Sequence, residues 1–174
     1  MSNTVEFVVR TVLIGAGATL VMDLWAALLR QWGVPSLNFA LLGRWVGHLP
    51  SGRWMHASIA SAAPVRGELW IGWCAHYAIG MTFSAALLWI HGLEWARSPS
   101  LRQALFLGIV TTVAPLFVLQ PAVGAGVASS KTSRPLFNAL KSVVTHMVFG
   151  LGLYLAAVAA GSLLPVCPAR SPAC

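Results

Sequence analysis

Four long apolar stretches constrain the fold of this chain more than any other feature. They cover about residues 8–29, 69–90, 101–119 and 143–164. A helix needs about 20 mostly apolar residues to cross the hydrocarbon core of a bilayer, and each stretch is close to that length. The sequence therefore predicts an all-α membrane protein, a single transmembrane domain over residues 1–174 with four membrane-spanning helices.

The composition excludes an ordinary soluble domain. Hydrophobic residues make up 57% of the 174 residues and charged residues only 9%, whereas soluble domains carry about 25% charge. The formal net charge is +7, and the basic residues concentrate in loops, where anionic headgroups attract them. We therefore expect the lipid bilayer and its anionic headgroups as partners, and no nucleic acid.

The number of crossings predicts the topology. Four crossings place both termini on one side and the two long loops, residues 30–68 and 120–142, on the other. Seven Lys and Arg residues lie on the loop side and four on the terminal side. By the positive-inside rule, the long loops are expected to be cytoplasmic and the termini outside.

Local patterns predict further detail in the first loop and the third helix. Apolar residues between Leu37 and Leu49 recur at helical spacing with Arg44 and His48, which indicates an amphipathic interfacial helix. A second apolar patch, residues 57–65, is too short to span and is expected to be interfacial or re-entrant. Pro115 predicts a kink or an early end of the third helix.

A faint internal repeat links the second and fourth apolar stretches. AHYAIGMTFSAALL (75–88) resembles THMVFGLGLYLAAV (145–158), with His at the same place and Gly four residues later. GAGATLVMD (15–23) and GIVTTVAPL (108–116) share a weaker pattern. These similarities suggest two duplicated helical hairpins, and transporters built from repeats hold their sites between them.

Four polar residues in the apolar stretches, Asp23, His76, Gln120 and His146, lie toward the loop side. Ionisable groups in lipid are costly, so they suggest a functional site. Small residues precede or follow Asp23, His76 and His146 at intervals of four, which predicts that these side chains face other helices. At a rise of about 1.5 Å per residue, they lie roughly 9, 10 and 5 Å inside the loop-side boundary. A shared polar site is therefore expected.

This polar site has three interpretations. An Asp–His hydrogen bond can simply lock the packing of the helices. The same groups can form a proton relay or an ion site, because His titrates near neutral pH. Alternatively, His76 and His146 can ligate haem, or a transition metal together with Asp23.

The two long loops contain a candidate site for an anion or an anionic lipid headgroup. The segment QPAVGAGVASSKTSRP (120–135) combines glycines, hydroxyls and positive charge, a composition that can form an anion nest. It is not a phosphate-binding P-loop, because Ser130 stands where that motif has Gly. A flexible basic loop is the alternative. The candidate residues are Arg44, His48, Arg53, His56, Arg66, Lys131, Thr132 and Arg134.

Neither catalytic motifs nor cysteines assign a reaction to the chain. The sequence contains no nucleophile elbow, no H-E-x-x-H and no C-x-x-C motif, so no enzyme class is predicted. Residues 165–174 are expected to form a flexible tail. Cys167 and Cys174 in that tail can pair in an oxidising compartment or remain free thiols.

Several segments resemble one known protein family. They are GAGATLVMDLW (15–25), GRWVGHLPSGRWMHASIASAAPVRGELWIGWCAHY (43–77), QPAVGAGVASSKT (120–132) and THMVFGLGLYL (145–155). Together they resemble a bacterial domain-of-unknown-function family of small four-helix integral membrane proteins. The resemblance implies a bacterial inner membrane location and a four-helix unit, and it implies no activity, substrate or cofactor.

These observations favour translocation of a small solute, an ion or a proton through the polar site, by a homo-oligomer or within a larger complex. One alternative is a haem-binding, metal-binding or accessory subunit of a membrane complex. A second alternative is a membrane enzyme acting on an anionic lipid headgroup.

Overall fold

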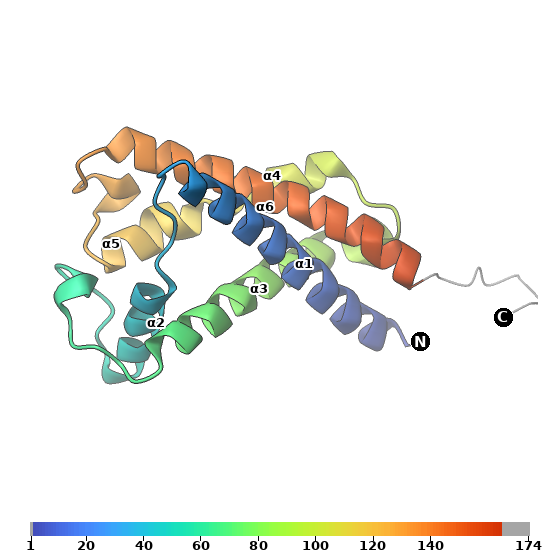
Figure 1. Cartoon of the computed structure of the whole chain (residues 1–174). Coiled ribbons are helices and arrows are strands. Elements are labelled where there is room, and N and C mark those ends of the chain that lie inside the picture. The colour runs from blue at the N-terminus through green and yellow to red at the C-terminus, as the bar shows by residue number, and fades with distance from the viewer. Residues whose placement is uncertain (1, 165–174) are drawn as a thin grey trace, which may run out of the picture.

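The computed structural model describes residues 2–164, and within them it contains helices and turns but no strand (Figure 1). Four helical segments are long and apolar enough to cross a membrane, which confirms the predicted all-α fold with four spanning helices. They are α1 (Asn3–Gln31), α3 (Glu68–Arg97), α4 with its continuation (Leu101–Ala122) and α6 (Pro135–Leu163). The predicted tail, with Cys167 and Cys174, lies outside the described residues.

The long helices run up and down a bundle, with the start of α1 beside the end of α6 and the long loops at the opposite end (Figure 1). Helix α1 packs against both α3 and α6, and α4 packs against α6. Glycines allow this close packing. A Cβ atom added at Gly15 of α1 would lie 2.5 Å from the Cα atom of Met81 in α3, and one at Gly108 of α4 would lie 2.9 Å from the Cα atom of Gly150 in α6. The small-residue stripes therefore face helix contacts.

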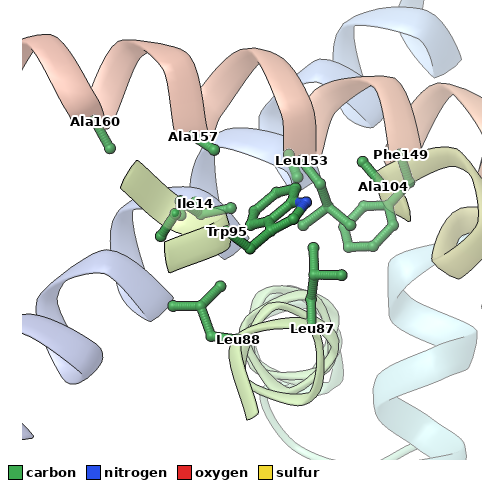
Figure 2. Close-up of a cluster of buried hydrophobic side chains, with 11 residues drawn as sticks. Ile14, Leu87, Leu88, Trp95, Ala104, Phe149, Leu153, Ala157 and Ala160 are labelled. Carbon is green, nitrogen blue, oxygen red and sulfur yellow. The ribbon is translucent and has the colours of Figure 1, made fainter. Parts of the chain in front are cut away.

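The apolar core fills the half of the bundle near the termini. Trp95, Leu87 and Leu88 from α3 meet Ile14 from α1 and Leu153 from α6 (Figure 2). Each of these five side chains is at most 4% exposed. The loop half of the bundle has no comparable cluster among the described residues. Many large apolar side chains instead cover the outer surface, as expected for helices that face lipid.

The third spanning helix changes its winding at Pro115. Regular α4 (Leu101–Thr111) is followed by the π-helical segment η3 (Ala114–Leu119) and the short α5 (Gln120–Ala122). Proline lacks an N–H group and cannot donate the backbone hydrogen bond that the preceding turn requires. The predicted interruption is therefore confirmed, and it takes the form of a widened turn.

The first long loop forms α2 (Phe39–His48), followed by the 3-10 turn η1 (Leu49–Ser51), so the predicted helix is confirmed. It packs tightly on α3, because Gly43 lies directly against the backbone of Glu68 and Gly72. The apolar patch at residues 57–65 contains only the short turn η2 (Ile59–Ser61) and no re-entrant helix.

The two long loops form one cap at the same end of the bundle. The backbone N–H of His56 donates to the carbonyl of Ala122 at 2.8 Å, and that of Ile59 donates to Val123 at 3.1 Å. Gly124 adopts a positive φ of 94° and leaves no room for a Cβ atom beside the carbonyl of Ala57. The second loop continues through η4 (Val127–Ser129) to α6. This cap joins the first loop to the end of the π-helical segment.

Candidate functional site

A cavity of about 530 Å³ extends from the loop end of the bundle into its interior. Its walls come from α1, α2, α3, the π-helical segment and α6, and its volume lies within the range of small-molecule sites. The polar and ionisable side chains among its lining residues are Thr19, Asp23, Ser36, Trp45, His76, Gln120, Ser129, Asn138, Lys141, Ser142, Thr145 and His146.

Asp23 and His76 meet in this cavity. The Nε2 atom of His76 and the Oδ1 atom of Asp23 are 2.9 Å apart, and the hydroxyl of Tyr77 donates to Oδ2 of Asp23 at 3.1 Å. Both carboxylate oxygens are therefore engaged. The His76 side chain is only 9% exposed and that of Asp23 is 16% exposed, so the hydrogen bonds are sheltered but reachable from the cavity.

Helix packing explains why these two side chains meet. Gly80 of α3 lies directly against the hydroxyl of Thr19 in α1. The two helices run in opposite directions, so one turn toward the loop end leads from Thr19 to Asp23 and from Gly80 to His76. The spacing by four therefore places Asp23 opposite His76, one turn from the contact between Gly80 and Thr19.

His146 of α6 lines the same cavity but has a different partner. Its Nδ1 atom lies 2.9 Å from the hydroxyl of Thr111, and Gly150, one turn away, packs against Gly108. His146 therefore lines the same cavity as Asp23 without joining its hydrogen bonds. The described residues contain no group of three His, Cys, Asp or Glu side chains that could hold a metal ion. The expected three-residue metal site with Asp23, His76 and His146 is not formed.

One face of α6 forms the polar lip of the cavity, which the sequence analysis did not recognise. Asn138, Lys141 and Ser142 line the cavity at its loop end. The Nζ atom of Lys141 donates to the carbonyl of Pro35 at 2.7 Å, and Nε2 of Gln120 donates to Ser142 Oγ at 3.2 Å. Positions 138, 141, 142, 145, 146 and 149 all line the cavity at helical spacing, and that periodicity is the signal that could have identified this face.

Arg44 binds groups within the cap, so its guanidinium is not available for an anion. This corrects its assignment to the headgroup site. Its guanidinium forms two 2.8 Å hydrogen bonds with the carboxylate of Glu68 and also donates to the carbonyls of Ile59, Ala60 and Ala62. The hydrogen bonds to Glu68 raise the pKa of Arg44 above its ordinary value. Arg44 thereby holds the first loop against the start of α3.

His48 and His56 also belong to the cap. The Nδ1 atom of His48 lies 2.8 Å from Nε2 of His56, and its Nε2 atom lies 3.0 Å from the carbonyl of Ala63. One histidine of this pair donates to the other, and both are turned into the cap. This contact makes them internal partners, in contrast to their expected role toward an external anion.

The segment 120–135 uses much of its own backbone for internal hydrogen bonds, so an anion nest there stays a prediction. Its backbone N–H groups at Gly124, Ala125, Ser129, Ser130 and Lys131 donate to carbonyls of the same segment, so these five groups do not face an anion. Thr132 accepts from the side chain of Asn138 and donates to Ser129. Among the described residues, four of the expected side chains are exposed and make no hydrogen bond: Arg53, Arg66, Lys131 and Arg134.

A charged network closes the opposite, terminal end of the bundle, and the sequence analysis did not anticipate it. Glu6 accepts hydrogen bonds from Arg10 at 2.9 Å and from Arg97 at 2.8 Å. Arg10, which is only 1% exposed, also donates to the carbonyls of Ala96 and Leu164. The network therefore ties α1 to the ends of α3 and α6.

Comparison with known proteins yields one family. The sequence model of a family described as "Protein of unknown function (DUF2938)" matches residues 12–160. No curated protein and no solved structure matches the chain.

Proposed function

We propose that this chain, which belongs to the DUF2938 family of proteins of unknown function, translocates a small solute across the bacterial inner membrane, with proton exchange at Asp23 and His76. The observation that carries the proposal is the cavity, which leads from the loop end of the bundle to a hydrogen-bonded Asp–His–Tyr group. An ionisable group at this depth is costly and is rarely retained without a use.

The walls of the cavity suit a small molecule. The deepest lining residues of α3 and α6 are the apolar Phe83 and Phe149, Thr19 is the deepest of α1, and most of the polar groups lie nearer the loops. Binding sites for small molecules combine largely apolar walls with a few polar groups that orient the ligand. A passage for a bare ion would instead need polar groups along its whole length.

Asp23 and His76 supply a protonatable pair beside the solute. Histidine changes charge near neutral pH, and a neighbouring carboxylate stabilises its charged form. We propose that a proton arriving from the loop side is taken up within this hydrogen-bonded pair and is later released from it. The hydroxyl of Tyr77 donates to the second carboxylate oxygen of Asp23.

Access to the site is one-sided, as alternating access requires. The apolar core around Trp95 and the network of Glu6, Arg10 and Arg97 separate the cavity from the terminal end. Translocation would open this end, and the π-helical turn at Pro115 provides a wall that can change its winding. Four helices are few for a complete pathway, so we propose that a homo-oligomer or a larger membrane complex acts, with its long loops in the cytoplasm.

Proton flux in liposomes tests the proposal. Purified protein is reconstituted, a potassium diffusion potential is imposed, and a trapped pH indicator records proton movement in wild type, Asp23→Asn and Glu94→Gln. Glu94 is the matched control, because its side chain is an exposed carboxylate (85%) far from the cavity. We expect flux above that of protein-free liposomes, reduced at least tenfold in Asp23→Asn and unchanged in Glu94→Gln. Equal flux in a stably folded Asp23→Asn variant would overturn the proposal.

A further inference from the structure

We infer that the cavity accepts an amphipathic oxyanion, with its carboxylate or phosphate head at Lys141 and its apolar chain directed inward. This inference rests on the proposed use of the cavity as a solute site and specifies the class of solute. The geometry that carries it is a cationic, polar lip placed above apolar walls.

The first argument is the pairing of charges. The chain has only four acidic residues, and each contacts a basic side chain other than Lys141: Glu6 contacts Arg10 and Arg97, Asp23 contacts His76, Glu68 contacts Arg44, and Glu94 contacts Arg97.

Lys141 is therefore the Lys or Arg side chain that lines the cavity, and it has no carboxylate partner. Its ammonium group has three donors, and its single hydrogen bond within the described residues goes to the backbone carbonyl of Pro35. Each carboxylate oxygen of Asp23 already has one hydrogen-bond partner, His76 or Tyr77. An anionic head group would accept hydrogen bonds from the remaining donors of Lys141 and neutralise its charge. A cationic head group would be repelled there.

A second argument comes from the amide of Gln120 at the same lip. Its nitrogen donates to Ser142, but its Oε1 atom is buried and has no hydrogen-bond partner among the described residues. A buried polar atom without a partner costs stability unless a ligand or water completes it. Almost none of the Oε1 surface is accessible, so a head group at Lys141 would reach this atom only after a movement of the Gln120 side chain.

The cavity beneath the lip suits an alkyl chain. Phe149 lies two helical turns deeper than Lys141 on α6, which corresponds to about 12 Å along the helix. Ile79 and Phe83 of α3 and Ala114 of the π-helical segment line the same inner region. Each methylene group transferred from water to such a surface contributes about 0.8 kcal/mol, so the inner walls favour a hydrocarbon tail over a polar one.

Ligand binding to the full-length protein in zwitterionic lipid nanodiscs tests the inference, with empty nanodiscs as the blank. The probes are radiolabelled octanoate and octyl phosphate, with octanol as the neutral comparison and octyltrimethylammonium as the cationic one. The variants are Lys141→Met, Lys141→Arg and the control Lys131→Met, which removes an exposed lysine that does not line the cavity. Thermal unfolding confirms that each variant is folded.

We expect Lys141→Met to weaken binding of octanoate and octyl phosphate at least tenfold, while Lys141→Arg and Lys131→Met remain within about threefold of wild type. Octanol binding should not change in Lys141→Met. If anionic lipid added to the nanodiscs displaces octanoate, the natural oxyanion is a lipid headgroup. If it does not, the ligand is a free solute. Either result supports the inferred class.

Equal octanoate affinity in wild type and Lys141→Met, or tighter binding of octyltrimethylammonium, would overturn the inference. The proposed function would survive that result if octanol still bound and proton flux still required Asp23. Loss of both octanol binding and proton flux in the wild type would instead refute the proposed function itself.

Discussion

Replacing Glu6 by Gln should strongly destabilise the protein, because Glu6 neutralises a buried arginine. Arg10 is 1% exposed and has a carboxylate partner in Glu6 alone among the described residues. Its other hydrogen bonds go to the backbone carbonyls of Ala96 and Leu164. In Glu6→Gln the amide can still accept a hydrogen bond, but the cation of Arg10 loses its counter-charge.

The expected loss follows from burial. Removing one partner of a buried ion pair costs about 3–5 kcal/mol, because an uncompensated charge remains. We expect the lower end, about 3 kcal/mol, because the second partner of Glu6, Arg97, is 30% exposed and can be solvated. Glu94→Gln breaks an exposed pair with the same Arg97 and should cost at most about 1 kcal/mol.

Equilibrium unfolding in mixed micelles, followed by tryptophan fluorescence, measures both variants. A double variant, Glu6→Gln with Arg10→Met, removes the stranded charge and should regain about 1 kcal/mol or more relative to Glu6→Gln. A loss for Glu6→Gln within about 0.5 kcal/mol of that for Glu94→Gln would refute the reasoning, because it would show that Arg10 is solvated in the folded protein.

Two further predictions, each with a matched control substitution, test contacts between the helices. Gly43→Ala should destabilise by about 1–3 kcal/mol, because the added Cβ atom would collide with the backbone of Glu68; Gly161→Ala, where no atom lies within 4 Å, should be neutral or stabilise by up to about 1 kcal/mol in the same unfolding assay. Thr111→Val should cost about 1 kcal/mol by removing the hydrogen bond to His146, and Thr111→Ser should retain that bond. A destabilising Gly161→Ala, or a neutral Thr111→Val, would contradict these contacts.

The sequence was sufficient for the number of spanning helices and for the contact faces of α1 and α3. Apolar length predicts a spanning helix because the bilayer fixes the length required. Spacing by four from Gly15 and Thr19 to Asp23, and from Gly80 back to His76, placed both polar residues toward other helices. Asp23 and His76 contact each other because these faces of α1 and α3 pack together.

The residues spaced by four around His146 predicted that its side chain faces another helix. They did not predict which side chain it contacts. Its neighbour depends on how α4 is rotated against α6, and the Gly108 contact brings Thr111 rather than Asp23 to the histidine. Helical spacing fixes the direction of a side chain relative to its own helix only. It carries no information on the rotation of the neighbouring helix.

The remaining site residues were missed because they lie at the ends of helices, which hydropathy did not predict. Hydropathy placed the start of the last helix near residue 143, whereas α6 begins at Pro135, so Asn138 and Lys141 were assigned to a loop. Glu6 was likewise missed, because α1 begins at Asn3 and its charged first turns carry little hydropathy signal. The pairing of Arg44 with Glu68 joins residues distant in sequence and also lay beyond local patterns.

Cysteine accessibility tests most directly whether the cavity opens to the loop side. In a chain whose three native cysteines are replaced by serine, Ala26→Cys places a thiol on the cavity wall, and Leu24→Cys places one on the 63% exposed outer face at nearly the same depth. Ser51→Cys marks the loop side. We expect a membrane-impermeant maleimide to label Ala26→Cys only from the side that labels Ser51→Cys, and to leave Leu24→Cys unlabelled. Equal protection of Ala26→Cys and Leu24→Cys, or labelling of Ala26→Cys from the terminal side, would contradict a cavity that opens toward the loops.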